Sequence, residues 1–533
     1  MYDIFPTYSY YKPYEHISFY VLSDKDKDLD ITITYLCETI TSISNKIKKG
    51  RNELTMDIGL HAGSYIVRAN FMNEEIIYTA ISVRDEECPS SLRYGFLSEF
   101  NTEDFNHDKI DYLSRFHIDT VQFYDWSYRH DDLVSPTETY SDMMGKHNNL
   151  TVVRAYIDNL HIRRMKAIGY GAIYASSENY WESHKSEGYY TFSGKPMTFI
   201  NRFFLMNISR TCPWHEHIIQ EYRKACKEVG FDGIHMDTYG FPKKALDHEG
   251  KLHELEYEIP ELINDAYAAI GNSTALIFNN VGGWPGYTDE KIKDYAKYAE
   301  IWPPMIRYQH LVDIAEHLKA NNKPVIIAAY PAPFKLDTAD RALEAELILS
   351  FVIASAGATQ LCFGEDNSIL TQGYYSDNSR LTGHQLNMLR HYHDFFLAYS
   401  DLLYSKSNKD VSMTHQDWDN HEYIFNPKGS AFGESNKIWY RIIESGKRKI
   451  IFAINLTNNN SNWNEGKNTP PSSHIAMECE IHSKIIRCWT VSPDKETLEP
   501  TLIEPEFLER ENSLYAKCNI DLFRTAMTVI EEE

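Results

Sequence analysis

The first part of the chain alternates apolar and polar positions with a period of two. Ile17, Phe19 and Val21 share one parity, and polar turn sequences separate this run from later ones. The predicted strands lie near residues 17–21, 31–35, 65–69 and 76–83. Because alternate side chains of a strand face opposite sides of a sheet, the pattern predicts short, half-buried strands. Several such strands in succession are typical of a small β-sandwich, which we predict over residues 1–87.

From about residue 90, apolar strands alternate with helical stretches. The eight strand candidates are Tyr94–Phe100, Thr120–Trp126, Ile168–Ala175, Gly233–Thr238, Ala275–Val281, Ala299–Trp302, Val325–Tyr330 and Thr359–Gly364. Between the first two, Ile110, Leu113 and Phe116 share one helical face. Alternating strands and helices predict a parallel sheet with right-handed crossovers, and eight such units predict a (β/α)8 TIM barrel over residues 88–400. A doubly wound open sheet is the alternative, but no strand is followed by a GxGxxG or P-loop sequence.

The pattern becomes β-like again after about residue 400. Ile438–Ile443 and Lys449–Leu456 flank the turn sequence Glu444-Ser445-Gly446-Lys447, which predicts a hairpin. Residues 457–471 are rich in Asn, Gly and Pro and predict a long loop. We therefore predict a second all-β domain over residues 401–533.

Charge and composition narrow the class of ligand. The 533 residues include 53 Lys and Arg against 76 Asp and Glu, a net charge of -23. Such a chain repels phosphate backbones and anionic lipid surfaces, so we expect neither nucleic acid nor a membrane as partner. A neutral ligand meets no such repulsion. The 37 Tyr and 9 Trp include enough rings to provide stacking surfaces for a sugar as well as core.

Cofactors and targeting segments leave no signal in the sequence. The eight cysteines form no CxxC pair, which argues against a zinc ribbon, a redox motif and a dense disulfide framework. We expect no metal and no other cofactor.

No 18-residue uncharged apolar run is present, and the N-terminus lacks the basic and apolar regions of a signal peptide. The expectation is a cytoplasmic protein as written, or a secreted one if a signal peptide has been removed.

In a (β/α)8 barrel the active site lies at the carboxyl ends of the strands. The residues at or just after the ends of the predicted strands include Asp125, Tyr128, Tyr174, Asp237, Asn279, Asn280, Glu300, Trp302, Tyr330, Glu365 and Asp366. Carboxylates and amides bond hydroxyl groups, and aromatic rings stack on sugar faces. The set contains no His/Cys cluster of the kind that binds zinc. This composition favours a carbohydrate site.

Two of these acids have the setting that glycosidic bond cleavage requires. The run Phe231–Asp237 ends on a carboxylate that Thr238 and Tyr239 follow, and Glu300 ends a second run beside Ile301 and Trp302. Neighbours that hydrogen-bond an ionised carboxylate favour a nucleophile, and a drier setting favours a protonated acid. We assign Asp237 as nucleophile and Glu300 as general acid/base, with Glu365 as the main alternative for the acid. A double displacement requires their carboxyl groups to lie about 5–6 Å apart.

Three segments carry a family resemblance. Thr120–His130, Gly230–Thr238, and Phe363–Asp366 with Ile369–Thr371 resemble motifs of glycoside hydrolase family 66, which contains dextranases and cycloisomaltooligosaccharide glucanotransferases. The resemblance covers most of the chain. It implies an N-terminal immunoglobulin-like domain, a (β/α)8 barrel and a C-terminal β domain of Greek-key type. It also implies that the strand-four acid, Asp237, is the nucleophile and that the acid after strand six, Glu300, is the acid/base of a retaining mechanism on α-1,6-linked glucan.

The expected substrate-binding residues are ten strand-end side chains. They are Asp125, Tyr128, His130, Tyr174, His235, Asn280, Trp284, Trp302, Tyr330 and Glu365. Asp125 is expected to bond a sugar hydroxyl in the subsite of the cleaved residue; the alternative is that it anchors Arg129. For the aromatic residues the alternative is a role in the core.

The sequence thus predicts a retaining endo-glycosidase (a dextranase) acting on dextran or isomaltooligosaccharides. Glucanotransferases of the resembled family carry a carbohydrate-binding module inserted in the barrel, and no all-β insertion of that size occurs between residues 90 and 400, which favours hydrolysis. The alternatives are a cycloisomaltooligosaccharide glucanotransferase, a non-catalytic glucan-binding protein, and an α-galactosidase or α-glucosidase on a similar barrel.

Overall fold

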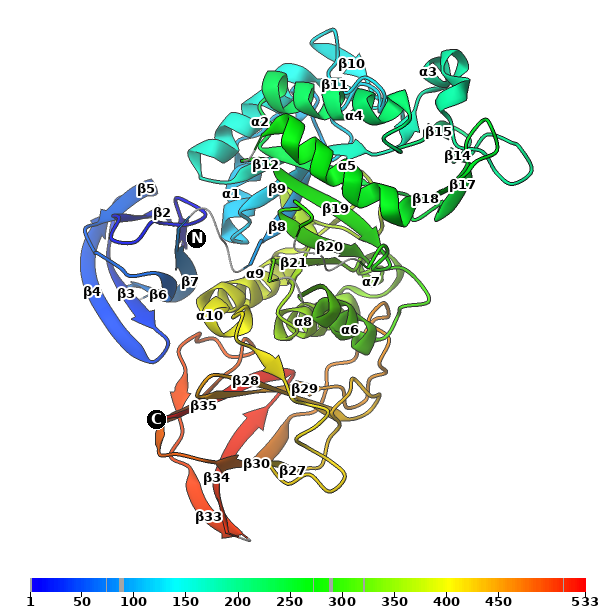
Figure 1. The fold of residues 1–533 in the computed structure, drawn as a ribbon. Helices are drawn as coiled ribbons and strands as arrows, with labels where there is room; N and C mark the ends of the chain where they lie inside the picture. Colours follow the sequence, from blue (N-terminus) through cyan, green and yellow to red (C-terminus); the bar gives the residue numbers. More distant parts are fainter. Residues whose placement is uncertain are drawn as a thin grey trace.

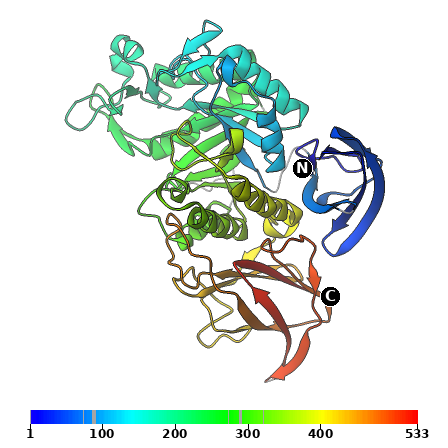
Figure 2. The same cartoon turned by 180° about the vertical axis from the view of Figure 1, so that it is seen from behind.

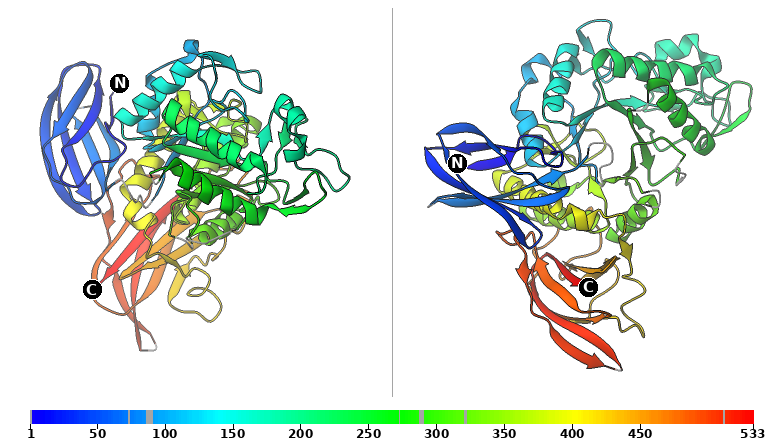
Figure 3. Two further views of the ribbon diagram at one scale, coloured as in Figure 1. Left: turned by 45° about the horizontal axis from the view of Figure 1, so that its top comes forward. Right: turned by 60° about the vertical axis from the view of Figure 1, so that its left-hand side comes forward.

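The chain forms three successive regions, in which a central sheet with helices lies between two β-rich parts (Figure 1). The computed structural model describes residues 2–72, 74–85, 91–271, 273–286, 291–319, 322–510 and 512–533. The N-terminal region lies beside the central one and the C-terminal region lies below it, as the views from behind and from the side also show (Figures 2 and 3).

Two sheets build the N-terminal region. One contains β1 (Asp3–Pro6), β2 (Ile17–Ser23) and β5 (Gly50–Met56), and the other contains β3 (Lys27–Tyr35), β4 (Glu38–Ile47), β6 (Gly63–Phe71) and β7 (Glu75–Val83). Both contribute to one core, in which Phe19 and Val21 meet Ile31 and Ile33. The four predicted strands are confirmed as β2, β3, β6 and β7. An immunoglobulin-like topology stays a prediction, and the expected boundary at residues 87 and 88 lies outside the described residues.

The central sheet curls back on itself in a barrel-like arrangement. Its parallel strands are β8 (Tyr94–Leu97), β9 (Thr120–Phe123), β12 (Lys166–Ala172), β16 (Gly233–Asp237), β19 (Ala275–Val281), β20 (Ala296–Glu300), β21 (Val325–Ala328), β22 (Thr359–Gln360) and β23 (Phe363–Gly364). β22 pairs with β21, and β23 pairs with β8, so the short strands on either side of Leu361 and Cys362 close the sheet. All eight predicted strand positions are confirmed, and two more short strands, β24 (Ser368–Ile369) and β25 (Ser379–Arg380), extend the sheet beyond β23.

Helices cover the outside of this sheet (Figure 1). The longer ones are α1 (Asp108–Arg115), α2 (Leu150–Ile162), α4 (Pro213–Lys224), α5 (Leu255–Ile270), α6 (Tyr308–Lys319), α8 (Ala339–Ser355) and α9 (Gly383–Ala398). Pro213 occupies the first turn of α4, where its missing N–H costs no hydrogen bond. Within the described residues, no helix lies between β19 and β20. None of the helices in the described part of the chain is both long and apolar enough to cross a bilayer.

Both faces of the central strands are buried, as their continuous apolar sequences predict. Tyr94, Ile277 and Tyr298 belong to the core inside the sheet, whereas Ile234 and Leu276 belong to the core shared with the helices. Side chains of one parity therefore point inward and those of the other point toward the helices. At the carboxyl ends of the strands, Asp237, Asn279 and Glu300 occupy the positions whose side chains point inward.

The C-terminal region again contains two sheets. The first consists of β26 (Lys409–Asp410), β28 (Ile438–Ser445), β29 (Arg448–Asn455), β35 (Thr525–Glu532), β31 (Ile485–Val491) and β32 (Thr501–Leu502). The second consists of β27 (Tyr423–Asn426), β30 (Ser473–Ile481), β34 (Ser513–Leu522) and β33 (Glu506–Arg510). The predicted hairpin is confirmed by the pairing of β28 with β29, and residues 457–471 contain no strand, as predicted for a loop. The Greek-key topology stays a prediction.

Candidate active site

Two carboxylates at the carboxyl ends of β16 and β20 share one side-chain amide. Asn279 Nδ2 donates to Asp237 Oδ1 at 2.7 Å and to Glu300 Oε2 at 3.0 Å. The two oxygens therefore lie no farther apart than the sum of these distances, about 5.7 Å, which suits a carboxyl pair that works by double displacement. The sequence assignment thus has the geometry that it requires.

A tyrosine hydroxyl fixes the other oxygen of each carboxylate. Tyr170 Oη donates to Asp237 Oδ2 at 2.6 Å, and Tyr330 Oη donates to Glu300 Oε1 at 2.8 Å. All four carboxylate oxygens consequently have a hydrogen-bond donor. Such bonds hold each group in one orientation before a substrate arrives, which is what a reaction at a defined carbon atom demands.

Burial and the neighbouring carboxylate of Glu300 raise the pKa of Asp237 to about 7, while the hydrogen bonds from Tyr170 and Asn279 lower it. The argument from sequence neighbours expected only Glu300 to lie in a drier setting. The structure places Asp237 in such a setting too, because its strand end faces the closed interior of the sheet. Burial and the charge of Glu300 thus favour the protonated form of Asp237, and the two hydrogen bonds favour its ionised form.

His235 lies one layer below the acids, inside the sheet. Its Nδ1 is 3.2 Å from Tyr94 Oη, and its ring meets Tyr298 edge to face. Burial lowers the pKa of His235 to about 3, so the imidazole is neutral. The structure places this residue in the barrel interior, where it supports the floor of the site, and not at the mouth where the sequence argument placed it.

A cluster of tyrosines surrounds Glu300. Tyr375 Oη lies 3.4 Å from the hydroxyls of both Tyr298 and Tyr330, and its ring stacks on Tyr124 at 4.2 Å between centroids. Tyr124 Oη donates to the carbonyl of Gly373 at 3.3 Å. The sequence argument selected Tyr330 but missed Tyr124, Tyr170 and Tyr375. Strand parity would have found Tyr124 and Tyr170, whereas Tyr375 lies in the segment between β24 and β25 and carries no such signal.

Several buried polar atoms near Asp237 have no hydrogen-bond partner within the described ranges. They are Asp125 Oδ2, His130 Nδ1, Tyr239 Oη and Asn279 Oδ1. Buried polar atoms are normally hydrogen-bonded, so these atoms mark places where the hydroxyl groups of a ligand can bond. Burial, followed by the charge of Asp142, raises the pKa of Asp125 to about 7, and burial lowers the pKa of His130 to about 4.

Asp125 does not act as the anchor of Arg129. The Arg129 guanidinium donates to the carbonyls of Tyr128 and Ser141 and lies over the Tyr128 ring, 4.0 Å from its centroid. Tyr128 is half-buried beneath it. Asp125 is thereby left to face the site, whereas Tyr128 supports the loop that follows β9.

The other predicted aromatic residues differ in how accessible they are to a ligand. Trp302 is 41% exposed and packs edge to face on Tyr330, so its indole lies at the rim of the site. Trp284 is half-buried, with Lys243 Nζ 3.9 Å from its ring centroid. Tyr174 Oη donates to the carbonyl of Phe241 at 2.6 Å and accepts from the N–H of Tyr239 at 2.7 Å, so it supports the backbone.

Two predicted residues lie elsewhere. Asn280 has the outward parity of β19 and is buried toward the helices, whereas the preceding amide, Asn279, faces the acids. Glu365 follows β23 and turns toward α1, where its carboxylate accepts from Ser98 and pairs with Lys109 Nζ at 3.1 Å. Neither position favours the predicted contact with substrate, and the partners of Glu365 among the described residues place its carboxylate away from Asp237. No group of three or more His, Cys, Asp or Glu side chains suited to a metal ion occurs in the described ranges.

Comparison with known proteins gives a family match and a close structural likeness. The model of glycosyl hydrolase family 66 matches residues 9–520. Two curated cycloisomaltooligosaccharide glucanotransferases of Niallia circulans are 29% and 28% identical over 280 and 286 residues, which are 47% and 48% of this chain and 29% of each relative. The matched region thus spans less than a third of these relatives' length.

Solved structures share the fold. A cycloisomaltooligosaccharide glucanotransferase from Paenibacillus sp., complexed with cycloisomaltoheptaose, superposes with a TM-score of 0.89 over 99% of both chains at 19% identity. An Anoxybacillus α-amylase superposes with a TM-score of 0.51 over 83% of this chain and 98% of its own at 11% identity. The superpositions therefore show that the chain shares the fold of these two proteins.

Proposed function

The chain belongs to glycosyl hydrolase family 66, and from this premise we propose that it is a retaining endo-glycosidase cleaving α-1,6-glucosidic linkages of dextran or isomaltooligosaccharides. One observation carries the proposal: Asp237 and Glu300 approach each other across the single amide of Asn279. A separation of at most about 5.7 Å between Asp237 Oδ1 and Glu300 Oε2 is closer to that of retaining than of inverting glycosidases, which favours retention.

The reaction proceeds in two displacements. Asp237 attacks the anomeric carbon while Glu300 donates a proton to the departing glycosidic oxygen, and a covalent glycosyl-enzyme forms. Glu300, now ionised, then takes a proton from water, which attacks the same carbon and frees Asp237. The hydroxyls of Tyr170 and Tyr330 hold the two carboxylates in place through both steps.

The second candidate is intramolecular transfer, in which a sugar hydroxyl replaces water. The names of the Niallia and Paenibacillus relatives favour this alternative. The absence of an inserted module loses its force as an argument for hydrolysis, because the superposition already covers 99% of the Paenibacillus chain. Digestion of dextran separates the two: linear isomaltooligosaccharides indicate the hydrolase, and cyclic products indicate the transferase.

The mechanism is tested by removing each carboxylate. Asp237→Ala and Glu300→Gln should each abolish turnover of dextran while retaining binding of isomaltooligosaccharides. Glu249→Gln, at an exposed turn, is the matched control and should keep wild-type activity. Wild-type activity in both active-site variants would refute the assignment.

The stereochemistry and the cleavage pattern complete the test. NMR of the first product should show the α-anomer. Release of single sugars from short aryl glycosides, with no cleavage inside dextran, would instead indicate an α-glucosidase or α-galactosidase, and binding without any turnover would indicate a glucan-binding protein.

A further inference from the structure

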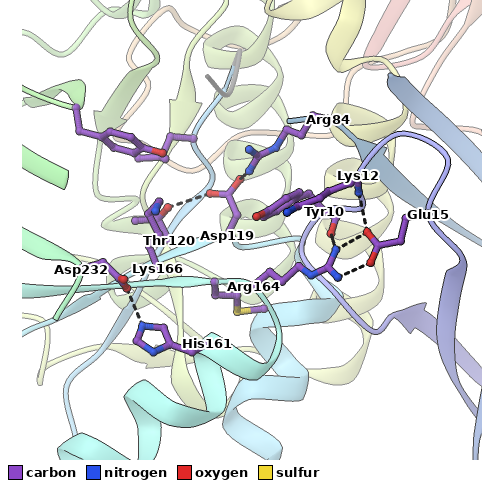
Figure 4. A pocket seen from close by; sticks show the side chains of 13 residues that line it. Tyr10, Lys12, Glu15, Arg84, Asp119, Thr120, His161, Arg164, Lys166 and Asp232 are labelled. Atoms are coloured by element: carbon purple, nitrogen blue, oxygen red, sulfur yellow. Dashed lines mark hydrogen bonds and ion pairs between the residues drawn. The ribbon is translucent and has the colours of Figure 1, made fainter. Parts of the chain in front are cut away.

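A cavity of about 430 Å³ lies at the end of the barrel opposite to the acids (Figure 4). The barrel contributes residues near the amino ends of its strands, among them Thr120 and Lys166, which begin β9 and β12. The N-terminal region contributes Tyr10, Lys12 and Arg84. The cavity is therefore separate from the active site and lies between two regions of the chain.

The acidic side chains of this cavity already have partners. Glu15 accepts from the guanidinium of Arg164, with one contact of 2.6 Å. Asp232 Oδ2 accepts from the N–H of Ala167 at 2.7 Å and lies 2.9 Å from His161 Nε2. These carboxylates have little capacity left for the hydroxyl groups of a neutral ligand.

The basic side chains are in excess. The single carboxylate of Asp119 serves two guanidinium groups, those of Arg93 at 2.9 Å and Arg84 at 3.5 Å. Arg84 Nε is buried without a hydrogen-bond partner, and the ammonium group of Lys12 has no ion-pair partner among the described residues. Lys166 also lines the cavity, with its Nζ 5.9 Å from the centroid of the Tyr295 ring. The cavity therefore offers spare positive charge and N–H donors in a chain whose net charge is -23.

We propose that this cavity binds a phosphate group, supplied either by inorganic phosphate or by a sugar phosphate. A phosphate is rich in acceptors and matches guanidinium and ammonium donors. The volume is within the range of small-molecule sites, so a sugar fits beside the phosphate, against Tyr10 and Tyr295. Because Lys12 and Arg84 belong to the N-terminal region and the barrel forms the rest of the cavity, the bound anion stabilises the contact between the two.

The test compares ligands at constant ionic strength. Calorimetric titration and thermal unfolding of the full chain are measured with inorganic phosphate, with a hexose 6-phosphate and with the uncharged hexose, each against sodium chloride of equal ionic strength. We expect both phosphates to bind and to raise the melting temperature by several degrees, and the hexose to do neither. Tighter binding of the hexose phosphate identifies a sugar phosphate as the better ligand, and the reverse order identifies inorganic phosphate.

Variants assign the binding to the cavity. Lys12→Met alters an exposed side chain and should weaken phosphate binding about tenfold, and Lys12→Met with Arg84→Gln should abolish it. Lys46→Met, on the exposed face of β4, is the control and should bind as the wild type does. The proposal is overturned if neither phosphate binds more strongly than chloride, if the hexose binds as tightly, or if Lys12→Met and the double variant both keep wild-type affinity.

Discussion

Asn279 connects the two carboxylates through one nitrogen atom, whose two hydrogens point to different acids. Replacing it with alanine removes both hydrogen bonds and lets the two groups move relative to the substrate carbon. We expect Asn279→Ala to lower kcat on dextran by about 100-fold or more, since a displacement of about 1 Å at a reacting centre has this effect. The measurement is steady-state kinetics on dextran.

The neighbouring amide provides the control for this prediction. Asn280 is also buried at the end of β19 but has the opposite parity. Asn280→Ala should lower the stability more than the activity, and its kcat should stay within a few-fold of wild type. Equal losses of kcat in the two variants would contradict the bridging role of Asn279.

Tyr170 influences the pKa of Asp237, the proposed nucleophile. The pKa of Asp237 is raised to about 7, so kcat/KM should rise with pH through this value as the carboxylate ionises. The Tyr170 hydroxyl bonds the ionised form and lowers that pKa. Tyr170→Phe should therefore move the acidic limb of kcat/KM to higher pH, by about one unit, and lower the plateau, because Asp237 loses one of the two hydrogen bonds that orient it.

Tyr174→Phe is the matched control for the pH profile. The hydroxyl of Tyr174 bonds the backbone of Phe241 and Tyr239 and does not touch a carboxylate. Its removal should leave the acidic limb in place. An acidic limb that moves to lower pH in Tyr170→Phe, or moves equally in both variants, would show that Tyr170 does not set the ionisation of Asp237.

At the scale of elements, the segment between β24 and β25 forms one wall of the site. A Cβ atom added to Gly373 would lie 3.0 Å from the indole of Trp302 and 3.2 Å from Glu300 Oε1. Gly373→Ala should therefore displace the carboxylate or the indole and lower kcat/KM by about tenfold or more, with no change in the melting temperature. The measurement pairs kinetics on isomaltooligosaccharides with circular-dichroism melting.

Gly383, which begins α9, serves as the control for this wall. A Cβ atom there meets nothing within 4 Å, and alanine is a better helix former than glycine. Gly383→Ala should keep full activity and equal or slightly higher stability. If Gly373→Ala leaves kcat/KM unchanged, the segment between β24 and β25 can shift to accommodate the added methyl group without displacing Glu300.

Strand patterns predicted the elements well because each one is buried on a defined face. All eight central strands lie where apolar runs occur, although β20 begins three residues earlier than expected, at Ala296. The exposed strand β4 was missed, since its isoleucines at 40, 43 and 47 do not recur with a period of two. A strand can be recognised in the sequence when at least one of its faces is regularly buried.

Side-chain direction limited the prediction of the site. The strand end at Asn279 and Asn280 was located correctly, but choosing between the two amides requires the register with neighbouring strands, which the sequence alone does not state. Glu365 failed for a related reason: the turn after β23 sends its carboxylate toward Lys109. The two acids proposed as catalytic could be found because both lie at strand ends and have the inward parity.

At the scale of the whole molecule, a buried ion pair joins the C-terminal sheets to the helix layer. Arg524 Nε donates to Glu344 Oε2 of α8 at 2.7 Å, and Arg524 Nη1 lies 3.2 Å from Asp494. Arg524→Met would leave the buried carboxylate of Glu344 without its partner. We expect a loss of about 3–5 kcal/mol in the free energy of unfolding, measured by chemical denaturation.

The same pair predicts a rescue that depends on charge and not on packing. Arg524→Met leaves the buried charge of Glu344 unpaired, and Glu344→Gln removes that charge. The double variant should therefore regain much of the stability that Arg524→Met loses. Since the pair lies between two regions, Arg524→Met should also separate the unfolding of the C-terminal sheets from that of the barrel, and calorimetry should show two transitions where the wild type shows one. If the double variant is less stable than Arg524→Met alone, removal of the buried charge has not restored stability. Arg524 would then stabilise the protein through the packing of its aliphatic chain and its bond to Asp494.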